Sequence, residues 1–163
     1  MNELIKAERQ RYWLTFLIED LPVGATFRPG LLHITVLPWF VSGVAEDELL
    51  KSFHSWFGRV DILSVALGPK EKFGPRKDIS VNSVFAPQLL AVHQAAIEWF
   101  SDIGARWAVK TPHVGSEYKP HIRRRRGTRL KEGQTLLLNS LSLVKARRRE
   151  DNAREVAGRI LLK

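Results

Sequence analysis

Two short segments that lie far apart in the chain most constrain what this sequence can fold into. Each places one apolar residue between a histidine and a second polar residue: His33 precedes Thr35, and His121 precedes Arg123. Side chains two positions apart in a β-strand point to the same face. The pattern therefore predicts two strands, each carrying an imidazole beside a group that can bind an oxyanion. Such a pair is suited to phosphate chemistry.

Length and composition limit the classes of protein that can contain these strands. The chain has 163 residues, of which 44% are hydrophobic, so we expect residues 1–163 to form a single globular domain. The absence of cysteine excludes disulfides, thiol catalysis and cysteine-bound metal. The N-terminal residues are charged and lack the apolar run of a signal peptide, and no stretch is long enough to span a bilayer. We therefore expect a cytoplasmic protein.

The apolar patterns predict a mixed chain of strands and helices without a linker. Helical spacing, an acidic first turn and an N-terminal proline predict helices over 45–57 and from Pro87 to Gly104. The run at 156–162 is also compatible with a short helix. The expected strands cover 11–18, 31–40, 61–67 (ended by Gly68 and Pro69), 79–85, the segment at Pro120–His121, 135–144 and 156–162. This order is compatible with two lobes related by an internal two-fold.

Basic residues are unevenly distributed along the chain. The net charge is +9, and no acidic residue occurs between 119 and 131, while a second basic cluster covers 145–149. Clusters of this kind attract polyanions through long-range attraction and counterion release. Because the first cluster adjoins His121, it favours a nucleic acid or a phosphate as partner. Its members are Lys119, Arg123, Arg124, Arg125, Arg126, Arg129 and Lys131.

The two histidine segments resemble the motifs of the 2H phosphoesterase superfamily, which includes RNA 2′,3′-cyclic phosphodiesterases and the 2′-5′ RNA ligases. That superfamily carries two His-x-Thr/Ser motifs. The first is intact as His33-Ile34-Thr35, and the second is entered through an aromatic-x-Pro-His lead-in at 118–121. Its hydroxyl residue is replaced by Arg123. The resemblance implies an α+β fold with two pseudo-symmetric lobes, antiparallel sheets flanking a central cleft, and helices outside.

The resemblance also implies a metal-independent phosphoesterase that acts on 2′,3′-cyclic phosphates of RNA or nucleotides. His33 and His121 are then the catalytic acid and base, in an order that the sequence leaves open. Thr35 and Arg123 are expected to bind the phosphate oxygens. Hydrolysis leaves a 2′-phosphate, and run in reverse with an RNA 5′-hydroxyl as nucleophile, the same site would make a 2′-5′ linkage. The alternative is a non-catalytic protein of the same fold that binds RNA or a nucleotide phosphate, because Arg123 replaces the second hydroxyl.

Further residues are candidates for contacts with RNA or substrate. Phe73 and Tyr118 are candidates for base stacking, and the loop residue His113 for a substrate contact. Arg124 and Arg125 extend the basic cluster beside His121. His54 and His93 fall in predicted helices and receive no role. The histidines lack metal-ligand spacing, so we expect no metal and no cofactor, and a monomer that does not bind membranes.

Overall fold

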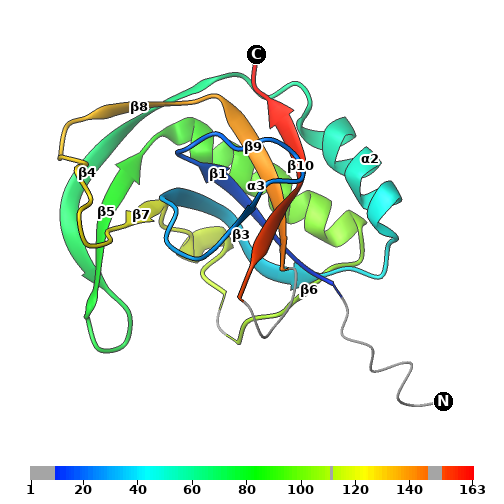
Figure 1. The fold of residues 1–163 in the computed structure, drawn as a ribbon, viewed down its shortest axis with the longest axis horizontal. Helices are drawn as coiled ribbons and strands as arrows, with labels where there is room; N and C mark the ends of the chain where they lie inside the picture. The colour runs from blue at the N-terminus through cyan, green and yellow to red at the C-terminus, as the bar shows by residue number, and fades with distance from the viewer. Residues whose placement is uncertain (1–9, 111, 147–151) are drawn as a thin grey trace.

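The computed structural model describes residues 10–110, 112–146 and 152–163 and shows an antiparallel sheet with helices packed against it (Figure 1). The helices are α2 (Glu46–Phe57) and α3 (Pro87–Asp102), and a 3-10 turn, η1, covers Gly115–Glu117. The strands are β1 (Arg11–Leu17), β2 (Thr26–Phe27), β3 (His33–Val41), β4 (Leu63–Phe73), β5 (Ile79–Phe85), β6 (Arg106–Trp107), β7 (His121–Arg123), β8 (Thr135–Leu138), β9 (Ser140–Ala146) and β10 (Arg154–Leu161). None of the helices in these ranges is long and apolar enough to cross a membrane.

The sheet consists of two lobes that meet at its centre. The strand order is β2-β10-β9-β1-β3-β7-β5-β4-β8, with β6 beside β3. We call β2, β10, β9, β1 and β3 the first lobe, and β7, β5, β4 and β8 the second lobe. The pairing of Ile34 in β3 with Ile122 in β7 joins the lobes, so each lobe contributes one histidine strand to the junction. The α+β fold with two lobes is thereby confirmed.

Both helices cover the same face of the sheet. Phe53 and Phe57 of α2 and Trp99 of α3 pack with Phe40 of β3 in the main core, and Trp99 donates a hydrogen bond from its indole N–H to Ser52 Oγ at 2.8 Å. Large aromatic side chains dominate the burial of apolar area in such a core. Alternation along each strand then sends the other side chains to the opposite face. We call this second face the open face.

Glycine at position 158 allows α2 to approach the sheet closely. A Cβ atom at Gly158 would lie 2.7 Å from Leu50 Cδ2 and 3.4 Å from two ring atoms of Phe53, both on α2. The absence of a side chain therefore lets the helix lie directly on β10. The segment at 156–162, which the sequence leaves between strand and helix, is a strand up to Leu161.

Two expected strand boundaries are wrong. Strand β4 does not end at Gly68 and Pro69 but continues to Phe73, with a register shift between Leu67 and Lys70. Proline lacks the backbone donor of a regular ladder, and a bulge accommodates it. The run at 135–144 is two strands, because β8 pairs with β4 whereas β9 pairs with β1 and β10. The chain thus crosses from one lobe to the other at Asn139.

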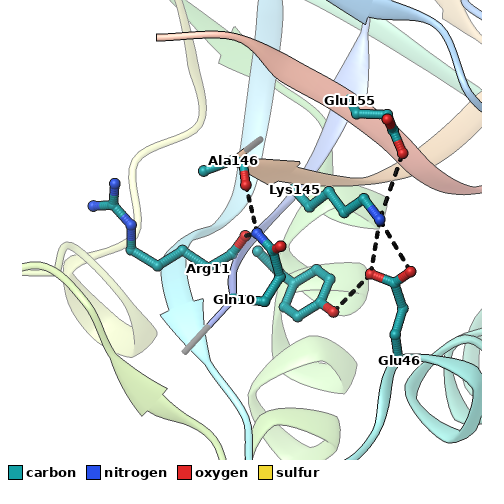
Figure 2. Close-up of polar contacts among 7 residues, drawn as sticks. Gln10, Arg11, Glu46, Lys145, Ala146 and Glu155 are labelled. Atoms are coloured by element: carbon teal, nitrogen blue, oxygen red, sulfur yellow. Dashed lines mark hydrogen bonds and ion pairs between the residues drawn. The ribbon is translucent and has the colours of Figure 1, made fainter. Parts of the chain in front are cut away.

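A polar network holds the first turn of α2 against the first lobe (Figure 2). Glu46 accepts hydrogen bonds from Tyr12 Oη at 2.9 Å and Lys145 Nζ at 3.0 Å, and Lys145 Nζ lies 3.5 Å from Glu155. Burial and the bond to Glu46 raise the pKa of Tyr12, so this phenol stays protonated and donates. A carboxylate at a helix N-terminus is also favoured by the helix dipole. The network therefore ties β1, β9 and β10 to α2.

Candidate functional site

The junction of the two lobes brings both histidine motifs onto the open face. Ile34 and Ile122 are fully buried in the main core, so their neighbours along each strand point away from it. Because β3 and β7 are antiparallel, pairing Ile34 with Ile122 places His33 across from Arg123 and Thr35 across from His121. The four residues expected at the site are therefore neighbours on one face.

His33 is held in one orientation by a backbone carbonyl of the preceding residues and by an indole ring. Its Nδ1 lies 2.8 Å from the carbonyl oxygen of Leu31, and the ring meets Trp13 edge-on with 4.5 Å between centroids. Burial lowers the pKa of His33 to about 4, and the positive charges of His121, Arg125 and Arg154 act in the same direction. His33 is therefore neutral at pH 7. Its Nδ1–H donates to the carbonyl, which leaves the lone pair on Nε2.

His121 repeats this arrangement in the other lobe. Its Nδ1 lies 2.7 Å from the carbonyl oxygen of Lys119, and Phe73 meets its ring edge-on with 4.8 Å between centroids. Burial lowers the pKa of His121, with a further decrease from the charge of His113 and an opposing effect of Glu71. No hydrogen bond to Nε2 of either histidine occurs among the described residues. Both imidazoles can therefore accept a proton at Nε2.

Thr35 is fixed at both its hydroxyl and its backbone carbonyl. Its Oγ1 lies 3.3 Å from the indole nitrogen of Trp13, which donates, so the hydroxyl hydrogen is left to bind an oxyanion. Its carbonyl oxygen accepts a hydrogen bond from Tyr118 Oη at 2.8 Å. Burial raises the pKa of Tyr118, and this ring stacks on His93 with 3.8 Å between centroids. One face of the expected stacking residue is thus occupied by the protein itself.

His93 is a buried residue that connects the two motifs through hydrogen bonds. The helical pattern of the sequence does not single it out. Its Nδ1 lies 2.9 Å from the carbonyl oxygen of Val36, and its Nε2 accepts the N–H of Gly115 at 2.9 Å. Burial lowers the pKa of His93, so the ring is neutral and donates through Nδ1. The contact links β3 to the turn that leads into His121. The only available signal in the sequence is the position of His93 between the core positions Leu89 and Ala96.

The arginines after His121 have different environments. Arg124 points inward, where Nη1 donates to Asn82 Oδ1 at 2.6 Å and to the carbonyl of Leu130 at 2.9 Å. This guanidinium holds the loop after β7 against β5. Arg123 and Arg125 are exposed, and Arg125 lines a pocket next to His33. The cluster at 147–149 lies outside the described residues.

Neither Ser83 nor Thr128 offers an accessible, unbound hydroxyl group in place of the one missing from the second motif. Ser83 lies across from His121 in β5, but its Oγ is buried near Gly68 and has no hydrogen-bond partner in the described part of the chain. Thr128 uses its hydroxyl to accept the N–H of Arg125 at 2.8 Å. Beyond Ser83 on the same strand, Phe85 is 65% exposed, an aromatic surface that the sequence pattern does not mark.

Metal-binding side chains do not gather near the histidines. Within residues 10–110, 112–146 and 152–163, no group of three or more histidines and carboxylates could hold a metal ion. The chemistry that this arrangement offers is proton transfer by two imidazoles, a hydrogen bond from Thr35 to an anion, and neutralisation of that anion by Arg123.

The low pKa of His33 predicts that acid destabilises the fold. An unfolded histidine binds a proton near pH 6.5, whereas His33 in the folded protein binds one near pH 4. Between these values the unfolded chain holds more protons, so the free energy of unfolding decreases as the pH is lowered from 6.5 to 4, by up to roughly 3 kcal/mol for this group. Urea unfolding at pH 7.0, 5.5 and 4.5 should show a smaller decrease in His33→Asn than in the wild type. An equal decrease in both proteins would contradict this assignment.

Comparisons with known proteins find similar folds among solved structures. No family model and no curated protein matches the sequence. A crystal structure described as a phosphoesterase matches with a TM-score of 0.63 and 13% identity, over 96% of this chain and 99% of that one. Escherichia coli LigT in complex with NADP⁺ matches with a TM-score of 0.62 and 14% identity, over the same shares. The protein TT0787 of Thermus thermophilus matches with a TM-score of 0.58 and 15% identity, over 94% and 97%.

LigT has also been solved with 3′-AMP, with ATP and with phosphate. These likenesses extend over nearly the whole of both chains, and the strands and helices align without a family-level sequence match. The resemblance stated from the two histidine motifs is thereby confirmed at the level of architecture. The described part of this chain has the curled antiparallel sheet, with helices packed against it, of the LigT-like phosphoesterase fold.

Proposed function

We propose that this protein is a metal-independent phosphoesterase that opens 2′,3′-cyclic phosphates of RNA or nucleotides and leaves a 2′-phosphate. The observation that carries the proposal is the equivalent placement of two imidazoles. His33 and His121 lie on adjoining strands, each with Nδ1 bound to the carbonyl two residues earlier and Nε2 without a partner among the described residues. Two such groups can serve both ends of an in-line displacement.

The reaction needs one base and one acid. A water molecule gives a proton to Nε2 of one histidine as its oxygen bonds to phosphorus. The bond from phosphorus to the 3′ oxygen breaks, and the other histidine, in its protonated form, gives this oxygen a proton. Thr35 and Arg123 bind the non-bridging oxygens as negative charge develops on them. Attack by an RNA 5′-hydroxyl in place of water, with the same proton transfers, would form a 2′-5′ linkage and leave a 3′-hydroxyl.

The negative charge of the bound substrate favours the protonated histidine that the reaction needs as its acid. Both histidines have lowered pKa values in the free protein, so both begin as bases. A phosphodiester anion between them favours the charged form of a neighbouring imidazole. Binding therefore converts one histidine into the acid. That LigT, a protein of similar fold, has been solved with 3′-AMP and with phosphate supports a phosphate-bearing ligand.

The test is turnover of a nucleoside 2′,3′-cyclic phosphate, and of a short RNA that ends in one, in the presence of EDTA. We expect a nucleoside 2′-phosphate as the product, because the 3′ oxygen is the leaving group in the proposed mechanism. Loss of turnover on adding EDTA would contradict metal independence. A 3′-phosphate product would contradict the assigned leaving group.

A second candidate function is favoured by the departure at Arg123. A protein of this fold that binds RNA or a nucleotide phosphate without catalysis would use the same open face and the basic loop after β7. The exposed guanidiniums of Arg123 and Arg125 supply charge for it. RNA binding that weakens with salt, without turnover of any cyclic phosphate, would establish this function. In either case we propose that the protein is a cytoplasmic monomer. Sedimentation of the free protein tests the oligomeric state.

A further inference from the structure

A pocket next to His33 extends the site into the first lobe. Its volume is about 180 Å³, and it is lined by aromatic and proline side chains, both residues of the first motif and two arginines, with no carboxylate among the lining residues that the structure describes. One arginine comes from each lobe. The residues used in the argument below are His33, Trp39, Arg125 and Arg154.

Arg154 is held in place while most of its donors stay available. It stands at the start of β10, and its Nη1 donates to the backbone oxygen of Asn152 at 2.6 Å and to Asn152 Oδ1 at 3.0 Å. Its guanidinium lies over the ring of Trp39, 5.3 Å from the centroid. Among the described residues, no carboxylate forms an ion pair with Arg154, and its Nε and Nη2 make no hydrogen bond. Within the described part of the chain, the side chain is thus oriented by contacts that leave its charge unpaired.

Arg125 brings a second positive charge from the other lobe. Its backbone N–H is held by Thr128 Oγ1, and its side chain lines the same pocket. Both arginines lie close enough to His33 for their charges to lower its pKa. Burial and the charge of Arg11 lower the pKa of Arg154 itself. Uncompensated positive charges at a partly desolvated site favour the binding of an anion.

We infer that this pocket binds a second phosphate group of the substrate, held between Arg125 and Arg154. The inference rests on the proposed function, because the cyclic phosphate is taken to lie at His33 and His121. In a nucleotide that ends in a 2′,3′-cyclic phosphate, any further phosphate of the chain lies on the 5′ side of that ribose. The substrate class is therefore a nucleotide or an RNA end with a phosphate on its 5′ side, not a bare nucleoside cyclic phosphate.

A phosphate fits the pocket better than a stacked base does. The ring of Trp39, the natural stacking surface, already contacts the guanidiniums of Arg154 and of Arg11, the latter 5.8 Å from its centroid. Guanidinium groups bind phosphate oxygens in a bidentate manner. A phosphate here would also offset the charges that lower the pKa of His33. It would thereby help this imidazole to hold a proton while the cyclic phosphate is bound.

Calorimetric binding of adenosine and adenosine 5′-phosphate tests the pocket without any need for turnover. In the wild type we expect the phosphate to increase affinity by about tenfold or more, as for hydrogen bonds to a charged group. Arg154→Ala and Arg125→Ala should each remove most of this gain. Arg125 is exposed, so its variant keeps the test valid if Arg154→Ala does not fold. Arg126→Ala, which changes an exposed arginine outside the pocket, is the matched control and should keep the gain.

An equal affinity for both ligands, or a gain that survives in Arg125→Ala and Arg154→Ala, would overturn the inference. A gain that depends on Arg123 alone would place the phosphate at the histidines and would also overturn it.

Turnover separates this inference from the proposed function. The kcat/KM of adenosine 2′,3′-cyclic phosphate is compared with those of its 5′-phosphorylated form and of a dinucleotide ending in the same cyclic phosphate. We expect a gain of about tenfold or more for one or both phosphate-bearing substrates, lost in Arg154→Ala. A gain for the dinucleotide alone assigns the pocket to an internucleotide phosphate, and a gain for neither overturns the inference. If no substrate is turned over, the proposed function fails while the binding measurements still decide on the pocket.

Discussion

Replacing either motif histidine by asparagine is expected to lower kcat for a 2′,3′-cyclic phosphate by about 10²- to 10⁴-fold, the contribution of a positioned acid or base. The amide of asparagine can occupy the place of Nδ1 and donate to the carbonyl of Leu31 in His33→Asn, or of Lys119 in His121→Asn. The substitution then removes Nε2 while it keeps the bond that orients the side chain. A loss of kcat without loss of folding assigns the proton transfers to Nε2.

The double variant makes this test sharper. In a mechanism that needs an acid and a base together, removing the second histidine costs little beyond the first loss. We expect His33→Asn/His121→Asn to be nearly as active as the weaker single variant. His54→Asn is the matched control, because His54 lies on the exposed side of α2, away from the open face. Wild-type kcat in either single variant would contradict the two-histidine mechanism, provided that circular dichroism shows a folded protein.

The sequence predicts the elements of this fold better than it predicts their partners. Periodicity locates α2 and α3 and most strands, because these patterns follow from which face of each element is buried. It does not show that 135–144 divides at Asn139 between the two lobes, because an apolar run looks alike whichever strand it pairs with. Nor does it show that β4 continues past Pro69, because the bulge depends on its pairing with β5.

For the candidate site, too, the sequence predicts the residues of one segment better than the residues that tertiary pairing brings to it. His33 and Thr35 share a face because side chains alternate along a strand, so their common orientation can be predicted from one short segment of sequence. Arg154 joins them only through the pairing of β10 with β9 and of β9 with β1, so no local pattern marks it. Arg124 and Arg125 are adjacent in the chain, yet one binds Asn82 and the other lines the pocket. Which arginine of a basic run faces a ligand depends on the loop conformation.

Arg123 decides whether the altered second motif still supports catalysis, and its variants should have large effects. Because Arg123 lies across from His33 on the open face, we expect its guanidinium to bind a non-bridging phosphate oxygen. Arg123→Ala should then lower kcat by about 10²- to 10³-fold, as when a donor to a developing oxyanion is removed. Arg126→Ala removes an equal charge from the exposed loop and should stay within about threefold of the wild type, since screened surface charges contribute little.

The hydroxyl variant distinguishes the possible roles of Arg123. Arg123→Thr restores the residue type found after the first histidine, and its hydroxyl can donate to the same oxygen. We expect it to recover activity to within about tenfold of the wild type, because one neutral donor replaces a stronger charged one. Arg123→Lys keeps the charge but loses the bidentate geometry, so its kcat should fall between those of the alanine variant and the wild type. If Arg123→Ala matches the wild type, the guanidinium does not bind the phosphate. If Arg123→Thr is faster than the wild type, the arginine obstructs the site, and the protein is better described by the binding function.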